Sequence, residues 1–188
     1  MDGKFKCVFG VLKTPIGLKI KDEMLEWLYP LFEVFTVEQE PPGTLFEYPA
    51  INLVLHMCVE TNEPIMYIHT KGAANVNINN TNVRYAWKDQ YENHFQDYLN
   101  AINIKKPLVV CPWTGPKKTT WFNSWIITPL AASILLKTFH IDKNRFYYES
   151  MFKNQPKIEV KGILANDCEH PIDVIETYKA KNLKLQKG

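Results

Sequence analysis

The sequence has no apolar run of about 18 residues, the length that a membrane-spanning helix needs. Its N-terminal segment also lacks the uninterrupted apolar stretch of a signal peptide, because Lys4 and Lys6 fall within it. Charge is nearly balanced, with 22 lysines and arginines against 20 aspartates and glutamates and a formal net charge of +2. So small an excess creates no strong field for nucleic acid or an anionic membrane. We therefore predict a cytoplasmic protein with neither a transmembrane segment nor a nucleic-acid partner.

Cysteines are few, and no two of them form a CxxC pair; the four are Cys7, Cys58, Cys111 and Cys168. Three lie in apolar stretches, where a free thiol behaves as a small hydrophobic group, and this indicates a reducing compartment. Four common motifs are also missing: GxxxxGK[ST], GxGxxG, HExxH and GxSxG. Their absence argues against P-loop, dinucleotide-binding, zinc-protease and α/β-hydrolase functions.

What the sequence does contain is an alternation of apolar strands and amphipathic helices over 188 residues, 46% of them apolar. Strands are predicted at 5–12, 34–37, 65–68, 108–111 and 158–165, and helices at 22–32, 48–59, 83–102, 128–135 and 171–178. Asp22 is expected to cap the first helix, and residues 73–82 are expected to form a surface loop. The alternation predicts an α/β fold with one domain over 1–188, either complete or a module of a longer protein. Its sheet is expected to be mostly parallel, with helices on both faces.

The strand predicted at 65–68 ends on four consecutive residues of functional interest, His69, Thr70, Lys71 and Gly72. In an open α/β sheet, ligands bind outside the carboxyl ends of the strands. From the pattern alone, a histidine at a strand end is more often a hydrogen-bonded surface residue, and Lys-Gly is common in turns. Residues 69–72 are nevertheless the first candidates for a site.

Four blocks, in order along the chain, resemble those of a family of glycosyltransferases from bacteria and large viruses of algae. They are YIHTKGA at 67–73, Arg84 with Trp87, WFNSWIIT at 121–128 and RFYYESMF at 145–152. The family carries YxHTKG, RxxW, GNFWW and RxxxExW. This chain lacks the glycine and one tryptophan of the third block and has Met151 in place of the last tryptophan. The resemblance covers about residues 45–152 and implies an A-type (GT-A-like) fold that binds a nucleotide sugar across the carboxyl ends of its sheet.

The resemblance implies transfer of a sugar from a nucleoside-diphosphate sugar, with a UDP-sugar expected, to a hydroxyl of a glycan or glycoprotein. The resemblance, together with the chemistry of sugar transfer, nominates three sets of residues. The catalytic set is Glu149, Lys71 and His69, and the donor-binding set is Thr14, Pro15, Thr70, Gly72 and Arg84. The acceptor-pocket set is Asn123, Ser124 and Trp125. Glu149 matches the family's late glutamate and is the expected general base. We expect burial among neighbouring aromatic residues to raise its pKa. Core packing competes with the pocket role of Trp125.

Negative charge grows on the leaving diphosphate, and a positively charged group must stabilise it. A-type enzymes usually hold Mn²⁺ there with an Asp-x-Asp motif, which this chain lacks, so two other sources of positive charge are considered. Lys71 or Arg84 would bind the phosphates directly. Alternatively, His69 and His170, with Asp167 or Glu169, would hold Mn²⁺ or Mg²⁺. The missing motif also fits a non-catalytic nucleotide- or sugar-binding module of the same fold. A third option is an interaction domain whose exposed tryptophans dock a protein partner.

Two further positions have competing interpretations. Glu47 precedes a predicted helix, where it would either contact the nucleotide or interact with the helix macrodipole. Lys117 and Lys118 follow a Pro-Trp-Thr-Gly-Pro turn, and we expect both in a solvated loop.

Overall fold

The computed structural model of the chain describes residues 4–40, 45, 47–71, 78–142, 144 and 146–169, the side chains of 78 and 79 excepted. Within this part, the strands are β1 (Phe5–Leu12), β2 (Phe32–Gln39), β3 (Ile65–His69), β4 (Leu108–Gly115), β5 (Thr119–Thr120), β6 (Trp125–Ile127) and β7 (Glu159–Ala165). The helices are α1 (Pro15–Leu31), α2 (Tyr48–Thr61), α3 (Ile78–Asn93), α4 (Phe95–Ala101), α5 (Pro129–Leu135) and α6 (Phe146–Ser150), with short 3₁₀ turns η1 (Pro116–Lys118) and η2 (Trp121–Asn123). The helix predicted at 171–178 lies outside the described residues.

The strands form one sheet in the order β2-β1-β3-β6-β4, with β7 along the other side of β4 and β5 against its end. Strands β2, β1 and β3 are parallel, and so are β4 and β7. Strand β6 is antiparallel to both β3 and β4, so β3 and β4 run in the same direction. The expected α/β fold is confirmed, but the sheet is mixed, because the three residues of β6 and the two of β5 add antiparallel pairs that the sequence pattern did not show.

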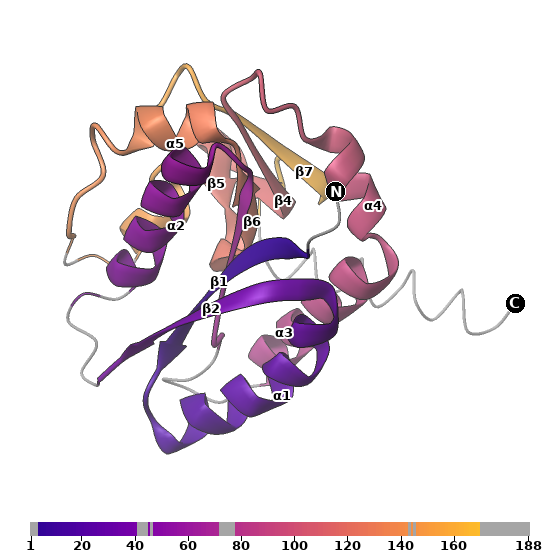
Figure 1. Cartoon of the computed structure of the whole chain (residues 1–188). Helices are drawn as coiled ribbons and strands as arrows, with labels where there is room; N and C mark the ends of the chain where they lie inside the picture. The colour runs from indigo at the N-terminus through magenta and orange to yellow at the C-terminus, as the bar shows by residue number, and fades with distance from the viewer. Residues whose placement is uncertain are drawn as a thin grey trace, which may run out of the picture.

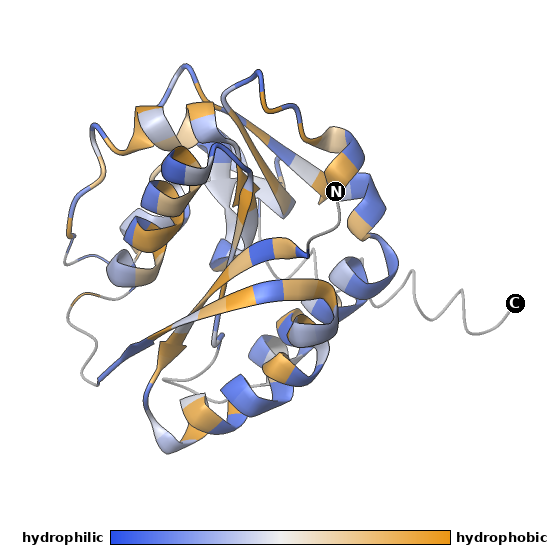
Figure 2. Ribbon diagram, in the orientation of Figure 1, coloured by the Kyte–Doolittle hydropathy of each residue, from blue (hydrophilic) through white to orange (hydrophobic). Residues whose placement is uncertain are grey.

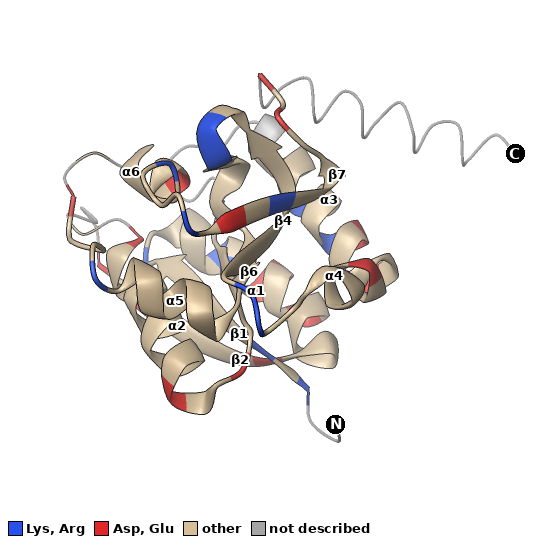
Figure 3. Ribbon diagram, turned by 90° about the horizontal axis from the view of Figure 1, so that it is seen from above, with Lys and Arg blue, Asp and Glu red and all other residues tan. Residues whose placement is uncertain are grey.

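Helices cover both faces of this sheet (Figure 1). One face packs against α1, α3 and α4, and the other against α2, α5 and α6. The strands between them are rich in apolar residues (Figure 2), and their buried side chains divide between two clusters. Basic and acidic residues are interspersed over the side of the molecule shown in Figure 3.

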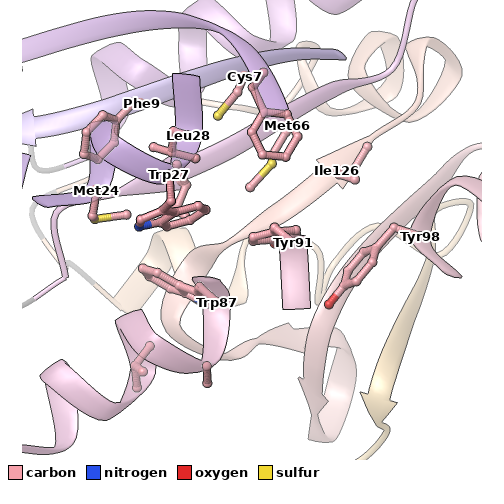
Figure 4. Close-up of a cluster of buried hydrophobic side chains, with 14 of the residues drawn as sticks. Cys7, Phe9, Met24, Trp27, Leu28, Met66, Trp87, Tyr91, Tyr98 and Ile126 are labelled. Atoms are coloured by element: carbon pink, nitrogen blue, oxygen red, sulfur yellow. The ribbon is translucent and has the colours of Figure 1, made fainter. Parts of the chain in front are cut away.

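The aromatic stripe expected on the helix at 83–102 is part of the core under α3 and α4. Trp87, Tyr91 and Tyr98 are fully buried beside Trp27 of α1 and Met66 of β3 (Figure 4). Fully burying a large apolar side chain stabilises a fold by about 1.5–3 kcal/mol, so this layer contributes strongly to stability. The predicted helix is, however, two helices, because the backbone leaves helical geometry at His94.

The first helix begins earlier than its sequence pattern indicated. Thr14 is its N-cap, with the Thr14 hydroxyl accepting a hydrogen bond of 2.9 Å from the Gly17 N–H, and Pro15 occupies the first turn. The prediction that Asp22 caps this helix is wrong, because Asp22 lies inside α1. Similarly, α3 starts at Ile78, within the loop expected at 73–82. None of the helices in the described part of the chain is both long and apolar enough to cross a bilayer.

The order of the strands creates a topological switch point between β1 and β3. From β1, the chain passes through α1 to β2 on one side; from β2, it passes through α2 to β3 on the opposite side of β1. The helices that follow the carboxyl ends of β1 and β3 along the chain, α1 and α3, pack on the same face of the sheet, and α2 packs on the other. Open α/β sheets bind their ligands outside the carboxyl ends of the strands, at the point where the strand order reverses, and in this sheet that point lies between β1 and β3.

Candidate functional site

The predicted donor-binding residues Thr14 and Thr70 both lie at this switch point. The Leu12 N–H donates to the Thr70 hydroxyl over 3.2 Å, and the Thr70 N–H donates to the Gly10 carbonyl over 2.9 Å. Thr70 therefore joins the ends of β1 and β3. Thr14 and Pro15 follow the end of β1 and begin α1, while the predicted Gly72 lies outside the described residues.

Two predicted cationic residues meet just beyond β3. The Arg84 guanidinium donates to the Lys71 carbonyl over 2.6 Å and to the Thr81 hydroxyl over 3.3 Å. Partial burial lowers the pKa of Arg84, although an arginine stays protonated at neutral pH. The structure thus places Lys71 and Arg84 side by side at the edge of the sheet that the ligand-binding rule indicates.

The expected general base is in contact with one of these cations. Nζ of Lys71 lies 3.8 Å from Oε1 of Glu149, and the two side chains are only 12% and 15% exposed. The ammonium also lies 5.1 Å from the centre of the Phe122 ring, a cation–π contact. A neighbouring ammonium favours the ionised carboxylate, which is the form that a base needs. This influence opposes the effect of burial that the sequence suggested.

Glu47, just before α2, interacts with three side chains from other segments. Its Oε2 accepts a hydrogen bond of 3.2 Å from the Tyr67 hydroxyl and another from the Asn123 amide, and its Oε1 lies 3.8 Å from Nδ1 of His69. Burial raises the pKa of Tyr67 well above its usual value, and the Glu47 carboxylate adds to this. We call Glu47, His69, Lys71, Phe122, Asn123 and Glu149 the rim cluster. The sequence offered only a nucleotide contact or an interaction with the helix macrodipole for Glu47, because its actual partners are far away along the chain.

Both nitrogens of the predicted catalytic and metal-binding residue His69 face protein groups. Nε2 lies 3.0 Å from the Phe122 carbonyl, which can only accept, so Nε2 carries a proton in this bond. Nδ1 faces Glu47, and the ring stacks on Tyr67 with centres 6.1 Å apart. A metal ion bound to His69 would have to replace one of these contacts. No three His, Cys, Asp or Glu side chains converge as metal ligands within the described residues, and His170 lies outside them.

The turn that carries Phe122 and Asn123 is strained. Phe122 has φ of 64° and Asn123 has φ of 56°, and Lys117 and Lys118 in the preceding turn η1 have φ of 57° and 63°. The left-handed region is unfavourable for a bulky residue such as phenylalanine, and strain of this kind is found preferentially at functional sites. The contact between His69 and the Phe122 carbonyl helps to hold the turn in place.

Lys118 anchors η1, so the prediction that it lies in a solvated loop is wrong. Its ammonium donates to the carbonyls of Gln155, Pro156 and Ile158 over 2.9, 3.4 and 2.6 Å. Lys117, in contrast, is exposed as expected.

The three residues predicted for the acceptor pocket are fully buried in this structure. The Trp125 indole N–H donates to the Asn123 Oδ1 over 2.8 Å, and its ring packs on Tyr67 and Phe152. The Ser124 hydroxyl is 2.7 Å from the Tyr91 hydroxyl. Asn123 is thus a buried member of the rim cluster, and Ser124 and Trp125 support the cluster from within the core. An acceptor ring could stack on Trp125 only after this packing changed.

Two hollows on the described surface lie away from the rim cluster. One is lined by residues 100–106, Leu108, Glu159 and Lys161, and the other by Lys4, Asp22, Leu25, Glu26, Tyr29 and Pro30. The first lies at the amino ends of β4 and β7, opposite the edge where parallel strands present ligand sites. We therefore place the candidate site by the convergence of charged side chains rather than by these hollows.

Comparisons of the chain with protein-family models, with curated proteins and with solved structures found no match.

Proposed function

We propose that this protein is a glycosyltransferase that moves a sugar from a nucleoside-diphosphate sugar, with UDP as the expected nucleotide, to a hydroxyl of a glycan or glycoprotein. The observation that carries the proposal is the contact between Lys71 and Glu149 beside the switch point of the sheet. It places a cation suited to a diphosphate next to a carboxylate suited to an acceptor hydroxyl. The sequence blocks that resemble a glycosyltransferase family supply the reaction class.

The donor would bind across the ends of β1 and β3. Its phosphates would meet the Lys71 ammonium and the Arg84 guanidinium, both of which form strong charge-assisted hydrogen bonds with phosphate oxygens. The turn at Thr14 and Pro15, one strand away, would lie along the nucleoside. Positive charge fixed at this place stabilises the negative charge that grows on the departing diphosphate.

In the transfer step, the acceptor oxygen forms a bond to the anomeric carbon, and the bond from that carbon to the diphosphate oxygen breaks. The bonding electrons leave with the nucleoside diphosphate, and the proton of the acceptor hydroxyl passes to Glu149. When the phosphates bind the Lys71 ammonium, they compete with the Glu149 carboxylate for it. The carboxylate then becomes available to the acceptor hydroxyl. Bound Mn²⁺ or Mg²⁺ would supply further positive charge next to the negative diphosphate, in addition to that of Lys71 and Arg84.

Calorimetric titration tests donor binding. We expect UDP and at least one UDP-sugar to bind more tightly than adenine or guanine nucleotides, and titrations with Mn²⁺ and with a chelator measure the dependence on metal. If no nucleotide or nucleotide sugar binds in either condition, the proposal is wrong.

Slow hydrolysis of the bound donor then tests catalysis. Glu149→Gln should lower its rate by about 10²-fold or more, the usual contribution of a general base. Glu60→Gln, at an exposed position of α2, is the matched control and should leave the rate unchanged. Binding without any turnover in the wild-type protein would favour a non-catalytic module that retains this fold.

A further inference from the structure

We infer that Glu47 is a positioning residue of the rim cluster, acting through Asn123 and His69 rather than by touching the substrate. The inference rests on the proposed function for its kinetic consequence. Its structural part concerns the free protein and can be tested without any ligand.

The contacts of Glu47 join three segments that are distant in the sequence. Glu47 itself lies just before α2. Of its partners, Tyr67 and His69 belong to β3, and Asn123 belongs to the strained turn η2. Tyr67 and Asn123 are fully buried, whereas the Glu47 side chain is 23% exposed. A carboxylate is suited to this place because it accepts hydrogen bonds at both oxygens and donates none.

The orientation of the Asn123 amide depends on this carboxylate. Its Oδ1 accepts from the Trp125 indole N–H over 2.8 Å and lies 3.4 Å from the Thr120 hydroxyl, and its Nδ2 donates to Glu47. An apolar side chain at position 47 would offer no acceptor to the Tyr67 hydroxyl or to the Asn123 amide. A buried polar group left without its partner is costly, so the network would rearrange.

The turn held in this way also shapes the surroundings of Lys71. Phe122 precedes Asn123 in the turn; its carbonyl contacts His69 and its ring lies under the Lys71 ammonium. Glu47 contacts the residues on both sides of this arrangement, His69 and Asn123. Losing the Glu47 carboxylate would therefore move Phe122, and through it the ammonium that faces Glu149.

The Trp125 indole N–H signal in a ¹H–¹⁵N NMR spectrum tests the structural part. Glu47→Leu should shift this signal clearly, because the Asn123 amide loses its acceptor and its Oδ1 moves. The Trp27 indole on α1, outside the rim cluster and the turn η2, is the internal reference and should stay in place. The exposed control Glu60→Leu should move neither signal. An unmoved Trp125 signal in a folded Glu47→Leu protein would overturn the inference, and Glu47→Asp, whose carboxylate is one methylene shorter, serves for the same measurement if the leucine variant does not fold.

Kinetics test the positioning role. Glu47→Leu should lower kcat for donor hydrolysis at least tenfold and change the Kd of UDP by less than twofold, because Lys71 and Arg84 both remain to bind the phosphates. An unchanged kcat, or a loss of UDP affinity as large as the loss of kcat, would refute this role. Failure of the wild-type protein to bind UDP would instead refute the proposed function, and the NMR measurement would still decide whether Glu47 orients Asn123.

Discussion

The ion pair between Lys71 and Glu149 has the same length as the pair between Lys88 and Glu92, but its surroundings differ. Both N–O distances are 3.8 Å. The side chains of Lys71 and Glu149 are 12% and 15% exposed, whereas those of Lys88 and Glu92, one turn apart on α3, are 46% and 36% exposed. The chain thus contains a partly buried ion pair and an exposed one that can be compared directly.

We predict that Lys71→Met destabilises the fold more than Lys88→Met. Removing one partner of a buried pair leaves a poorly compensated charge, so a loss of about 1–3 kcal/mol in the free energy of unfolding is expected for Lys71→Met. An exposed pair contributes about 0–1 kcal/mol, so Lys88→Met should have little effect. Urea denaturation of both variants measures the difference, and equal losses would contradict the role assigned to burial.

Lys71→Met should also weaken the binding of UDP at least tenfold, which corresponds to about 1.4 kcal/mol. The reason is that the ammonium is lost where the phosphates are proposed to bind, whereas Lys88 lies on an exposed part of α3. Calorimetric titration of the two variants and the wild type checks this. Equal UDP affinities for the wild type and Lys71→Met would exclude Lys71 from the donor site.

Two adjacent lysines of η1, both with left-handed backbone, provide a second comparison. Lys118→Ala removes an ammonium that bonds three carbonyls and should lower the free energy of unfolding by about 2 kcal/mol. Lys117→Ala has the same change of side chain at a neighbouring left-handed position, but Lys117 is exposed, and we expect less than about 0.5 kcal/mol. Thermal and urea unfolding of the pair distinguish the anchoring role of Lys118 from a general effect of the turn.

The sequence pattern predicted elements whose signals are local. The bounds of β1 at 5–12 agree with the pattern because a buried strand reads as a continuous apolar run that the next turn ends. The pattern also placed His69 and Lys71 at the end of a strand, whereas Glu149 was nominated by the family resemblance. In the structure, an ion pair joins Lys71 to Glu149.

The features that the pattern missed depend on contacts between distant segments. Strand β6 has three residues, too few to show a period, and it exists because β3 and β4 flank it. Glu47 and Lys118 both look like surface charges in the sequence, and only their tertiary partners show otherwise. Thr14 and Asp22 are both common N-cap types, and Thr14 prevails because Pro15 fits the first turn that follows it.

Gly17→Ala tests how closely α1 approaches the end of β1. In most helices this change stabilises, by about 0.5–1 kcal/mol, because glycine loses more conformational freedom on folding. Here a Cβ at Gly17 would lie 1.9 Å from the Leu12 carbonyl oxygen, so the helix would have to move away from the strand. We expect a loss of about 2–3 kcal/mol by urea denaturation. Lys19→Ala, at an exposed position of the same helix, should stay within about 0.5 kcal/mol of the wild type, and a stabilised Gly17→Ala would disprove the close approach.

The last prediction concerns the response of stability to alkaline pH. Burial raises the pKa of the Cys58 thiol to about 12, from an ordinary value of 9.0, and the thiol contacts the Ile127 carbonyl over 3.3 Å. Below pH 9 this thiol is protonated in both the folded and the unfolded chain. Above pH 9 the unfolded chain releases the proton while the folded chain retains it, so stability falls as pH rises, by about 1.4 kcal/mol per pH unit for this group.

Other buried groups add to the alkaline loss, so the contribution of Cys58 is best isolated by difference. The free energy of unfolding of the wild type minus that of Cys58→Ala should decrease by about 2 kcal/mol between pH 8 and pH 10.5, because only the wild type carries this thiol. Thr61→Ala, in the same helix and without an ionisable group, should keep a constant difference from the wild type over that interval. Parallel curves for wild type and Cys58→Ala would show that the thiol ionises in the folded chain as readily as in the unfolded one, which would contradict its burial between α2 and β6.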